Sequence, residues 1–144
     1  MKKILIVDDD KKIVTALTVR LKAAGYEVLG APNGLEGIKL AVGERPDLLI
    51  LDIWMPAGLG FSLAQRLKAL GFDDLPIIFL TASKKHGLRE AALGLGAVAF
   101  FEKPYDTKEL LATIARVLKM EWKTPPATAA NSATTEKPAA ISKI

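Results

Sequence analysis

The chain has 144 residues, of which 50% are hydrophobic and 25% charged, and its formal net charge is +4 at pH 7. These values are typical of one globular domain. The lack of cysteine excludes disulfides and thiolate metal sites. The basic residues do not gather into a stripe of the kind that binds nucleic acid. The apolar run near Met1 is too short for a signal peptide or a membrane span. We therefore expect a cytoplasmic protein that binds neither nucleic acid nor membrane.

Hydrophobic patterning predicts strands and helices in alternation. Short apolar runs, which are typical of strands buried on both faces of a parallel sheet, occupy residues 4–7, 48–51, 76–80 and 97–101. A further strand over residues 26–29 is weaker because it is brief and carries Glu27. Apolar residues at helical spacing follow each run, over residues 11–24, 35–42, 61–70, 87–95 and 106–118. The helix over 87–95 is the weakest because it contains Gly94 and lies between two further glycines.

This order of elements, with short connections, predicts a doubly wound α/β domain around a five-stranded parallel sheet with five flanking helices. We place the domain at residues 1–121. Residues 122–144 are rich in Pro, Ala, Thr and Ser and have almost no apolar periodicity, so we expect a flexible tail or linker there.

The other predicted elements are arranged around the apolar run over residues 48–51. It ends at Asp52, and Met55-Pro56 prevents a helix from following at once, so residues 53–55 should form an extended or turning loop. Ligands of open α/β sheets bind where the strands end. The residues predicted at that edge are Asp8, Asp9, Asp10, Asp52, Thr81 and Lys103.

Several carboxylates in one crevice repel each other unless a cation neutralises them. Oxygen ligands without histidine or cysteine select a hard ion, and two carboxylates with waters and a phosphate are a usual way to hold Mg²⁺. Beside such an ion Asp52 can act as a nucleophile toward phosphorus. Lys103 and the Thr81 hydroxyl would then contact the other oxygens of the phosphoryl group.

The same residues give the chain a resemblance to a known family, the receiver domains of two-component response regulators. The similarity covers residues 2 to about 120, and its motifs follow one another at consecutive strand ends. They are Ile-Val-Asp8-Asp9, Leu-Asp52-Ile-Trp-Met-Pro56, Leu-Thr81-Ala82, the stretch from Gly96-Ala97 to Phe100, and Lys103-Pro104.

The resemblance implies a flavodoxin-like fold in which Asp52 receives a phosphoryl group from a phosphohistidine on a sensor histidine kinase or a phosphotransfer protein. It implies Mg²⁺ held by Asp9, Asp52 and the backbone carbonyl of Trp54, with Asp8 reaching the ion through water. It further implies a cis peptide between Lys103 and Pro104, which X-Pro bonds tolerate. Thr81 and Phe100 would form the coupled switch, in which the Thr81 hydroxyl is drawn to the phosphoryl group and the Phe100 ring turns inward behind it.

A protein of this kind is a phosphoacceptor switch and not an enzyme, with at most intrinsic self-phosphorylation and self-dephosphorylation. The family's usual output surface corresponds to the helix over 87–95, the strand over 97–101 and the helix over 106–118. We expect an output protein that the sequence does not identify to bind there, and a homodimer through that surface is a further expectation.

Three positions depart from the family pattern. Leu59-Gly60 stands where family members often have an acidic residue before the glycine that opens the third helix. Trp54, two residues after the acceptor, is large, and we predict that it shields the acyl phosphate from water; equal dephosphorylation rates for wild type and Trp54→Asn would remove this idea. Phe100 lacks the hydroxyl of a tyrosine switch, so recognition there must rely on shape and apolar contact.

Other interpretations of these residues stay open at this point. Asp8 to Asp10 could cap the helix that follows, and for Asp10 we expect that role. His86 is expected to be a solvated loop residue. A haloacid dehalogenase-type phosphatase would use Asp8-x-Asp10, but Lys12 stands where that family has threonine or valine and no cap domain is evident. A phosphate-independent scaffold of receiver shape would bind its partner equally well after Asp52→Asn.

Overall fold

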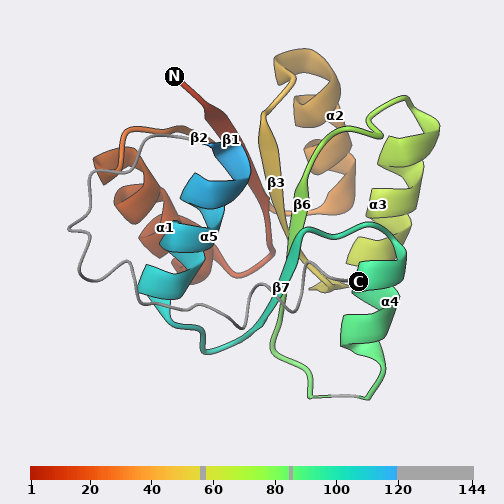
Figure 1. Ribbon diagram of the computed structural model, residues 1–144. Helices are drawn as coiled ribbons and strands as arrows, with labels where there is room; N and C mark the ends of the chain where they lie inside the picture. The colour runs from red at the N-terminus through yellow and green to blue at the C-terminus, as the bar shows by residue number, and fades with distance from the viewer. Residues whose placement is uncertain (56–57, 85, 120–144) are drawn as a thin grey trace.

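The fold is built on one parallel sheet of five strands in the order β2-β1-β3-β6-β7. A computed structural model describes residues 1–55, 58–84 and 86–119 (Figure 1). The strands are β1 (Lys3–Val7), β2 (Glu27–Ala31), β3 (Leu48–Asp52), β6 (Ile77–Thr81) and β7 (Ala99–Glu102). All four neighbouring pairs are parallel, so every strand of this sheet ends at the same edge. We call it the carboxyl edge.

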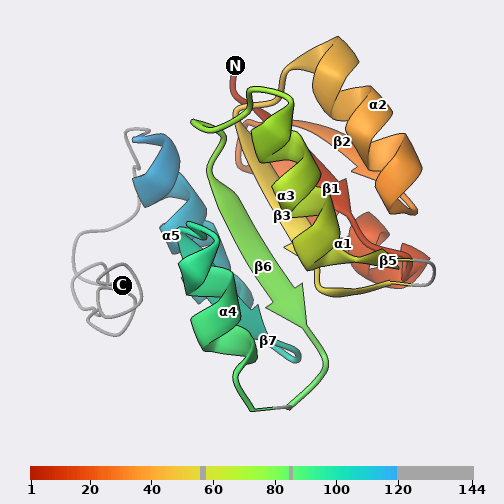
Figure 2. The same ribbon diagram turned by 90° about the vertical axis from the view of Figure 1, so that its right-hand side faces the viewer.

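Helices cover both faces of the sheet. Figures 1 and 2 show α1 (Lys11–Ala23) and α5 (Thr107–Leu118) on one face of the sheet. On the other face lie α2 (Gly34–Glu44), α3 (Gly60–Ala69) and α4 (Leu88–Gly94). The arrangement confirms the predicted doubly wound α/β class.

Strands β3 and β6 are buried from end to end because both of their faces meet helices. Alternate residues of a strand point to opposite faces, so each strand contributes to two separate cores. In β6, Ile78 and Leu80 pack with α1 and α5, whereas Ile77 and Phe79 pack under α2, α3 and α4. This explains why the runs in β3 and β6 show no polar alternation.

Strand and helix boundaries differ from the patterning in a few places. The second strand runs over Glu27–Ala31 instead of 26–29, because its limits are set by pairing with the five residues of β1. The loop expected after Asp52 contains a small antiparallel hairpin of β4 (Trp54–Met55) and β5 (Gly58–Leu59). Patterning did not predict that hairpin. The predicted tail over residues 122–144 lies outside the described residues.

Short polar side chains fix the beginnings of three helices. The N-caps are Asp10 for α1, Asn33 for α2 and Asp106 for α5, and each side chain accepts a hydrogen bond from a backbone N–H of the first turn. By contrast α4 has seven residues, begins after Gly87 and has no side-chain cap. The predicted weakness of this helix therefore agrees with how it is capped.

Among the helices that the structure describes, none combines the length and the apolar character needed to cross a bilayer.

Candidate functional site

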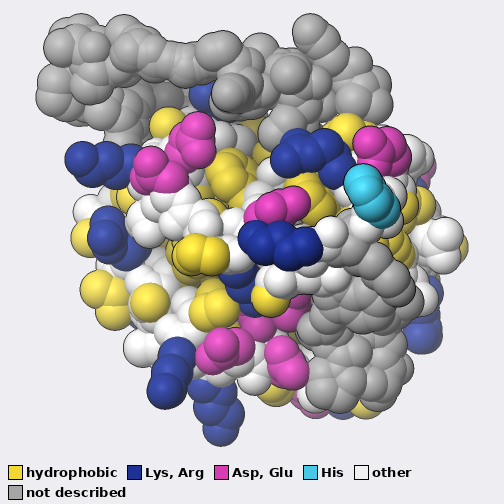
Figure 3. Space-filling model, turned by 90° about the horizontal axis from the view of Figure 1, so that it is seen from below, with side chains coloured by type: hydrophobic (Ala, Val, Ile, Leu, Met, Phe, Trp, Pro, Cys, Tyr) yellow, Lys and Arg dark blue, Asp and Glu magenta, His cyan; other side chains and the backbone are white. Residues whose placement is uncertain are grey.

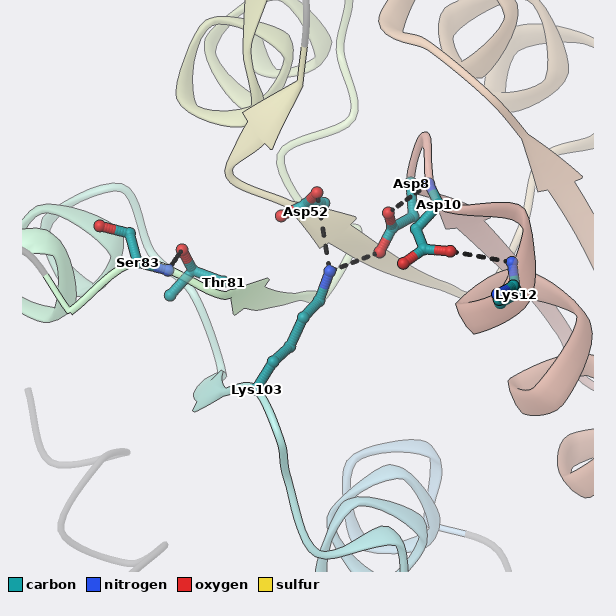
Figure 4. Close-up of polar contacts among 7 residues, drawn as sticks. All are labelled: Asp8, Asp10, Lys12, Asp52, Thr81, Ser83 and Lys103. Carbon is teal, nitrogen blue, oxygen red and sulfur yellow. Dashed lines mark hydrogen bonds and ion pairs between the residues drawn. The ribbon is translucent and has the colours of Figure 1, made fainter.

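The predicted site residues meet at the carboxyl edge. Asp8 follows β1, Asp52 ends β3 and Thr81 ends β6, while Lys103 follows β7. Figure 3 looks onto this edge from below and shows acidic side chains next to lysine or arginine side chains near its middle. Figure 4 shows Lys103 reaching between Asp8 and Asp52, with Thr81 on the neighbouring strand. The topology thus brings together residues that are far apart in the sequence.

Local hydrogen bonds orient the acidic residues after β1. Asp8 Oδ1 accepts a hydrogen bond from the backbone N–H of Asp10 at 2.9 Å. The Asp10 side chain in turn accepts one from the backbone N–H of Lys12 at 2.9 Å, which makes Asp10 the N-cap of α1 as predicted. Asp10 is therefore a structural residue, and Asp8, only 2% exposed, is held inside the site.

Lys103 forms an ion pair with each of two buried carboxylates. Its Nζ lies 3.0 Å from Asp8 Oδ2 and 3.7 Å from Asp52 Oδ2. Asp52 is only 5% exposed, so the positive charge offsets part of the cost of burying both acids. The backbone N–H of Lys103 donates to the Thr81 carbonyl at 2.7 Å, and the Lys103–Pro104 peptide is cis, as the resemblance implied.

The site has the ligands that a hard divalent cation requires. Each of Asp8, Asp9 and Asp52 offers a carboxylate oxygen, and these oxygens lie within 4.8 Å of one another. Among the described residues Lys103 pairs with Asp8 and Asp52, and a bound metal ion would neutralise further negative charge of the three carboxylates. All-oxygen ligands of this kind fit Mg²⁺. Trp54 lies in β4, and the predicted role of its carbonyl stays a prediction; its side chain is not described.

Gly60 has a positional role that the sequence did not reveal. Its backbone N–H donates to the Ile53 carbonyl at 2.7 Å, which folds the loop after β3 back against the strand end. A Cβ on Gly60 would collide with the Asp52 carbonyl oxygen and would lie 3.0 Å from Ile53 Cα. The loop is thus anchored through backbone contacts at the place where the family often has an acid. The Leu59-Gly60 departure was the available signal.

The two predicted switch residues lie on the same side of the sheet. Thr81 is fully buried, and its hydroxyl oxygen accepts a hydrogen bond from the backbone N–H of Ser83 at 3.0 Å. Phe100 is 3% exposed and belongs to the core under α4. The Arg89 guanidinium lies over the Phe100 ring, 5.0 Å from its centroid. Sequence analysis did not single out Arg89.

Tyr105 is a second residue that the sequence did not point to. Burial raises the pKa of its phenol above the ordinary value, and the negative charge of Asp8 adds to the rise. Tyr105 therefore lies close enough to Asp8 for the two groups to interact electrostatically. His86 is exposed, in agreement with its predicted place in a solvated loop.

Comparisons with known proteins agree on one family. The model of the response regulator receiver domain matches residues 4–115. The response regulator MprA of Mycobacterium bovis is 38% identical over 130 residues, which cover 90% of this chain and 55% of that protein. MprA of Mycobacterium leprae is 39% identical over the same shares. This chain spans about half the length of these curated relatives.

Solved structures show the same fold. The Vibrio cholerae chemotaxis protein CheY4 superimposes with a TM-score of 0.76 at 32% identity, covering 81% of this chain and 98% of that chain. The response regulator TrrA from Thermotoga maritima, solved in complex with Mg(2+)-BeF, gives a TM-score of 0.72 at 32% identity, covering 81% of this chain and 99% of that chain. The predicted flavodoxin-like fold is therefore confirmed.

Proposed function

Because this chain belongs to the receiver-domain family of two-component response regulators, we propose that it is a switch controlled by phosphorylation of Asp52. The observation that carries the proposal is the position of Lys103, whose ammonium group pairs with both Asp8 and Asp52. A lysine in that position supplies positive charge where a phosphoryl group on Asp52 would place its oxygens.

The proposed reaction is phosphoryl transfer to a carboxylate. An Asp52 oxygen attacks the phosphorus of the donor, a P–O bond forms, and the bond from phosphorus to the leaving group breaks with its electron pair. Mg²⁺, held by Asp9 and Asp52 with Asp8 nearby, would supply a further positive charge when bound. Lys103 stabilises the charge on the phosphoryl oxygens, and the Thr81 hydroxyl donates a hydrogen bond to one of them. Water later hydrolyses the acyl phosphate.

The contacts of Asp8 disfavour this residue as the nucleophile. One Asp8 oxygen accepts from the Asp10 N–H and the other pairs with Lys103, at 2.9 and 3.0 Å. An acid held at both oxygens suits the support of a cation better than attack on phosphorus. The family match disfavours the haloacid dehalogenase-type alternative for the same position. We further propose that the chain has no separate substrate and catalyses at most its own phosphorylation and dephosphorylation.

The partners follow from the family. Response regulators act with sensor kinases and output domains, and we propose a phosphohistidine of a sensor histidine kinase or a phosphotransfer protein as the donor to Asp52. The proposed output surface consists of α4, β7 and α5, and a homodimer would form through the same surface.

Incubation with acetyl phosphate and MgCl₂, followed by intact mass spectrometry, tests this function. Wild type should gain the mass of one phosphoryl group, and Asp52→Asn should gain none. Asp10→Asn is the matched control, because it removes a neighbouring acid and keeps a good helix cap, so it should be labelled like wild type. Equal labelling of Asp52→Asn, or no labelling of a folded wild type, would contradict the proposal.

A further inference from the structure

Arg89 and Phe100 form a contact between the surface and the buried switch. The Arg89 carbon Cζ lies 5.0 Å from the centroid of the Phe100 ring, within the range of a cation–π interaction. Arg89 is an exposed residue of α4, whereas Phe100 is 3% exposed and lies in β7. The guanidinium therefore covers the outer side of a ring that is packed in the core.

A short series of neighbours connects this contact to Asp52. Asp52 is paired in register with Leu80 of β6, which directly precedes Thr81. Phe79 is paired with Phe100 of β7, and both belong to the core under α4. Because side chains alternate along a strand, Thr81 lies on the same face as Phe79. Thr81 and Phe100 are thus diagonal neighbours on adjacent strands, beneath α4.

We propose that Arg89 is a positioning residue that holds the Phe100 ring in its buried position and thereby favours the phosphorylated state. This inference rests on the proposed function, because it concerns the regulation of the same site. A phenylalanine ring has no hydroxyl with which to form a hydrogen bond, so its position depends on packing and on the attraction of the cation to its face. Removing the cation weakens the buried position and leaves the acidic cluster intact.

The contact also links the ring to the proposed output surface. The helix that carries Arg89 has seven residues and no side-chain cap, so few local interactions hold it in place. A movement of the Phe100 ring would release Arg89 and change the charge that α4 presents at the surface. A partner that binds α4 would then distinguish phosphorylated from unphosphorylated Asp52 by the position of the Arg89 side chain.

The chain contains a matched control for this contact. Arg45, the C-cap of α2, lies over the ring of Phe72 at the same distance of 5.0 Å. Phe72 follows α3 at its carboxyl-terminal end, which is the end of the helix away from the site. Arg45→Gln removes an equivalent interaction without touching the switch.

The test compares the binding of beryllium fluoride, a tetrahedral stand-in for the phosphoryl group, in the presence of MgCl₂. Binding is followed by the NMR signal of the Thr81 amide. Arg89→Gln should raise the half-saturating concentration about two- to five-fold, the loss expected for an exposed cation–π contact. Arg89→Lys, which keeps a cation, should restore most of the affinity, and Arg45→Gln should bind like wild type.

The outcomes separate the two proposals. If wild type binds beryllium fluoride and Arg89→Gln binds equally well, the role of Arg89 is wrong and the phosphorylation switch stands. An equal loss in Arg45→Gln, or a loss in Arg89→Lys as large as in Arg89→Gln, would also overturn the role of Arg89. If folded wild type neither binds beryllium fluoride nor is labelled by acetyl phosphate, both proposals fail.

Discussion

Three consecutive aspartates after β1 have three different environments. Asp8 is buried and pairs with Lys103, Asp9 is exposed and adds an oxygen to the acidic cluster, and Asp10 caps α1. The capping role of Asp10 was predictable because a helix pattern begins at the next residue. The ion pair of Asp8 with Lys103 joins residues 95 positions apart, so it could be anticipated only through the order of strands and helices. A local contact can be inferred from neighbouring residues, whereas a contact across the sheet requires the topology as well.

Gly60 gives the first prediction at the scale of single residues. A Cβ at this position would collide with the Asp52 carbonyl oxygen, so Gly60→Ala must displace the acceptor. We expect slower labelling by acetyl phosphate and a free energy of unfolding lower by about 1–3 kcal/mol, as for overpacking at a tight contact. Both are measured on the same protein, by mass spectrometry over time and by urea denaturation.

Gly43→Ala is the control for this substitution. Gly43 lies in α2 with nothing within 4 Å of the position of a Cβ, so alanine there should raise stability by up to about 1 kcal/mol and leave labelling unchanged. If Gly60→Ala were labelled as fast as Gly43→Ala, the loop would not position Asp52.

Helix α5 gives a prediction at the scale of elements. Asp106 accepts hydrogen bonds from the backbone N–H groups of Lys108 at 2.9 Å and Glu109 at 3.4 Å. Because α5 covers the core beneath β6 and β7, losing this cap should destabilise the whole domain. We expect Asp106→Ala to lower the free energy of unfolding by about 1 kcal/mol. Asp106→Asn, which keeps an acceptor, should cost much less, and equal losses in urea denaturation would argue against capping.

The predictability of each element depends on what fixes its limits. Strand β3 was predictable because burial on both faces demands an unbroken apolar run. The hairpin of β4 and β5 was not, because each of its strands has two residues, too few for any periodicity. The predicted limits of β2 were wrong because this edge strand is defined by its pairing with β1, which the residues of β2 alone do not indicate.

At the scale of the whole molecule, the parallel sheet concentrates negative charge at one edge. Asp8, Asp9 and Asp52 come from two different strand ends, and a divalent cation that binds the folded state should stabilise it. We expect MgCl₂ to raise the thermal unfolding temperature of wild type. When the Mg²⁺ concentration is one hundred times its dissociation constant, the free energy of unfolding should rise by about 2.7 kcal/mol. A chelator should reverse the effect.

Asp9→Asn provides the comparison for this measurement. It removes one ligand and some repulsion, so the variant should unfold at a similar or higher temperature without Mg²⁺ and should gain less from Mg²⁺ than wild type. Equal gains for the two proteins would place the ion elsewhere.

Most of the site could be predicted from the topology alone. Once strands and helices alternate, the residues after each strand must meet at one edge, and this brought Asp8, Asp52, Thr81 and Lys103 together. Arg89 could not be found in this way, because its contact with Phe100 depends on which side of α4 faces β7. Contacts between a helix and a sheet are set by side-chain packing, and the spacing of apolar residues in the sequence does not specify that packing.

The most direct measurement of the central claim is to locate the phosphoryl group. Wild type treated with acetyl phosphate and MgCl₂ is reduced with borohydride, which converts an acyl-phosphorylated aspartate to homoserine, and the peptides are sequenced by mass spectrometry. We predict homoserine at position 52 and nowhere else in the chain. Homoserine at position 8, or none at all in folded protein, would contradict the assignment of Asp52 as the acceptor.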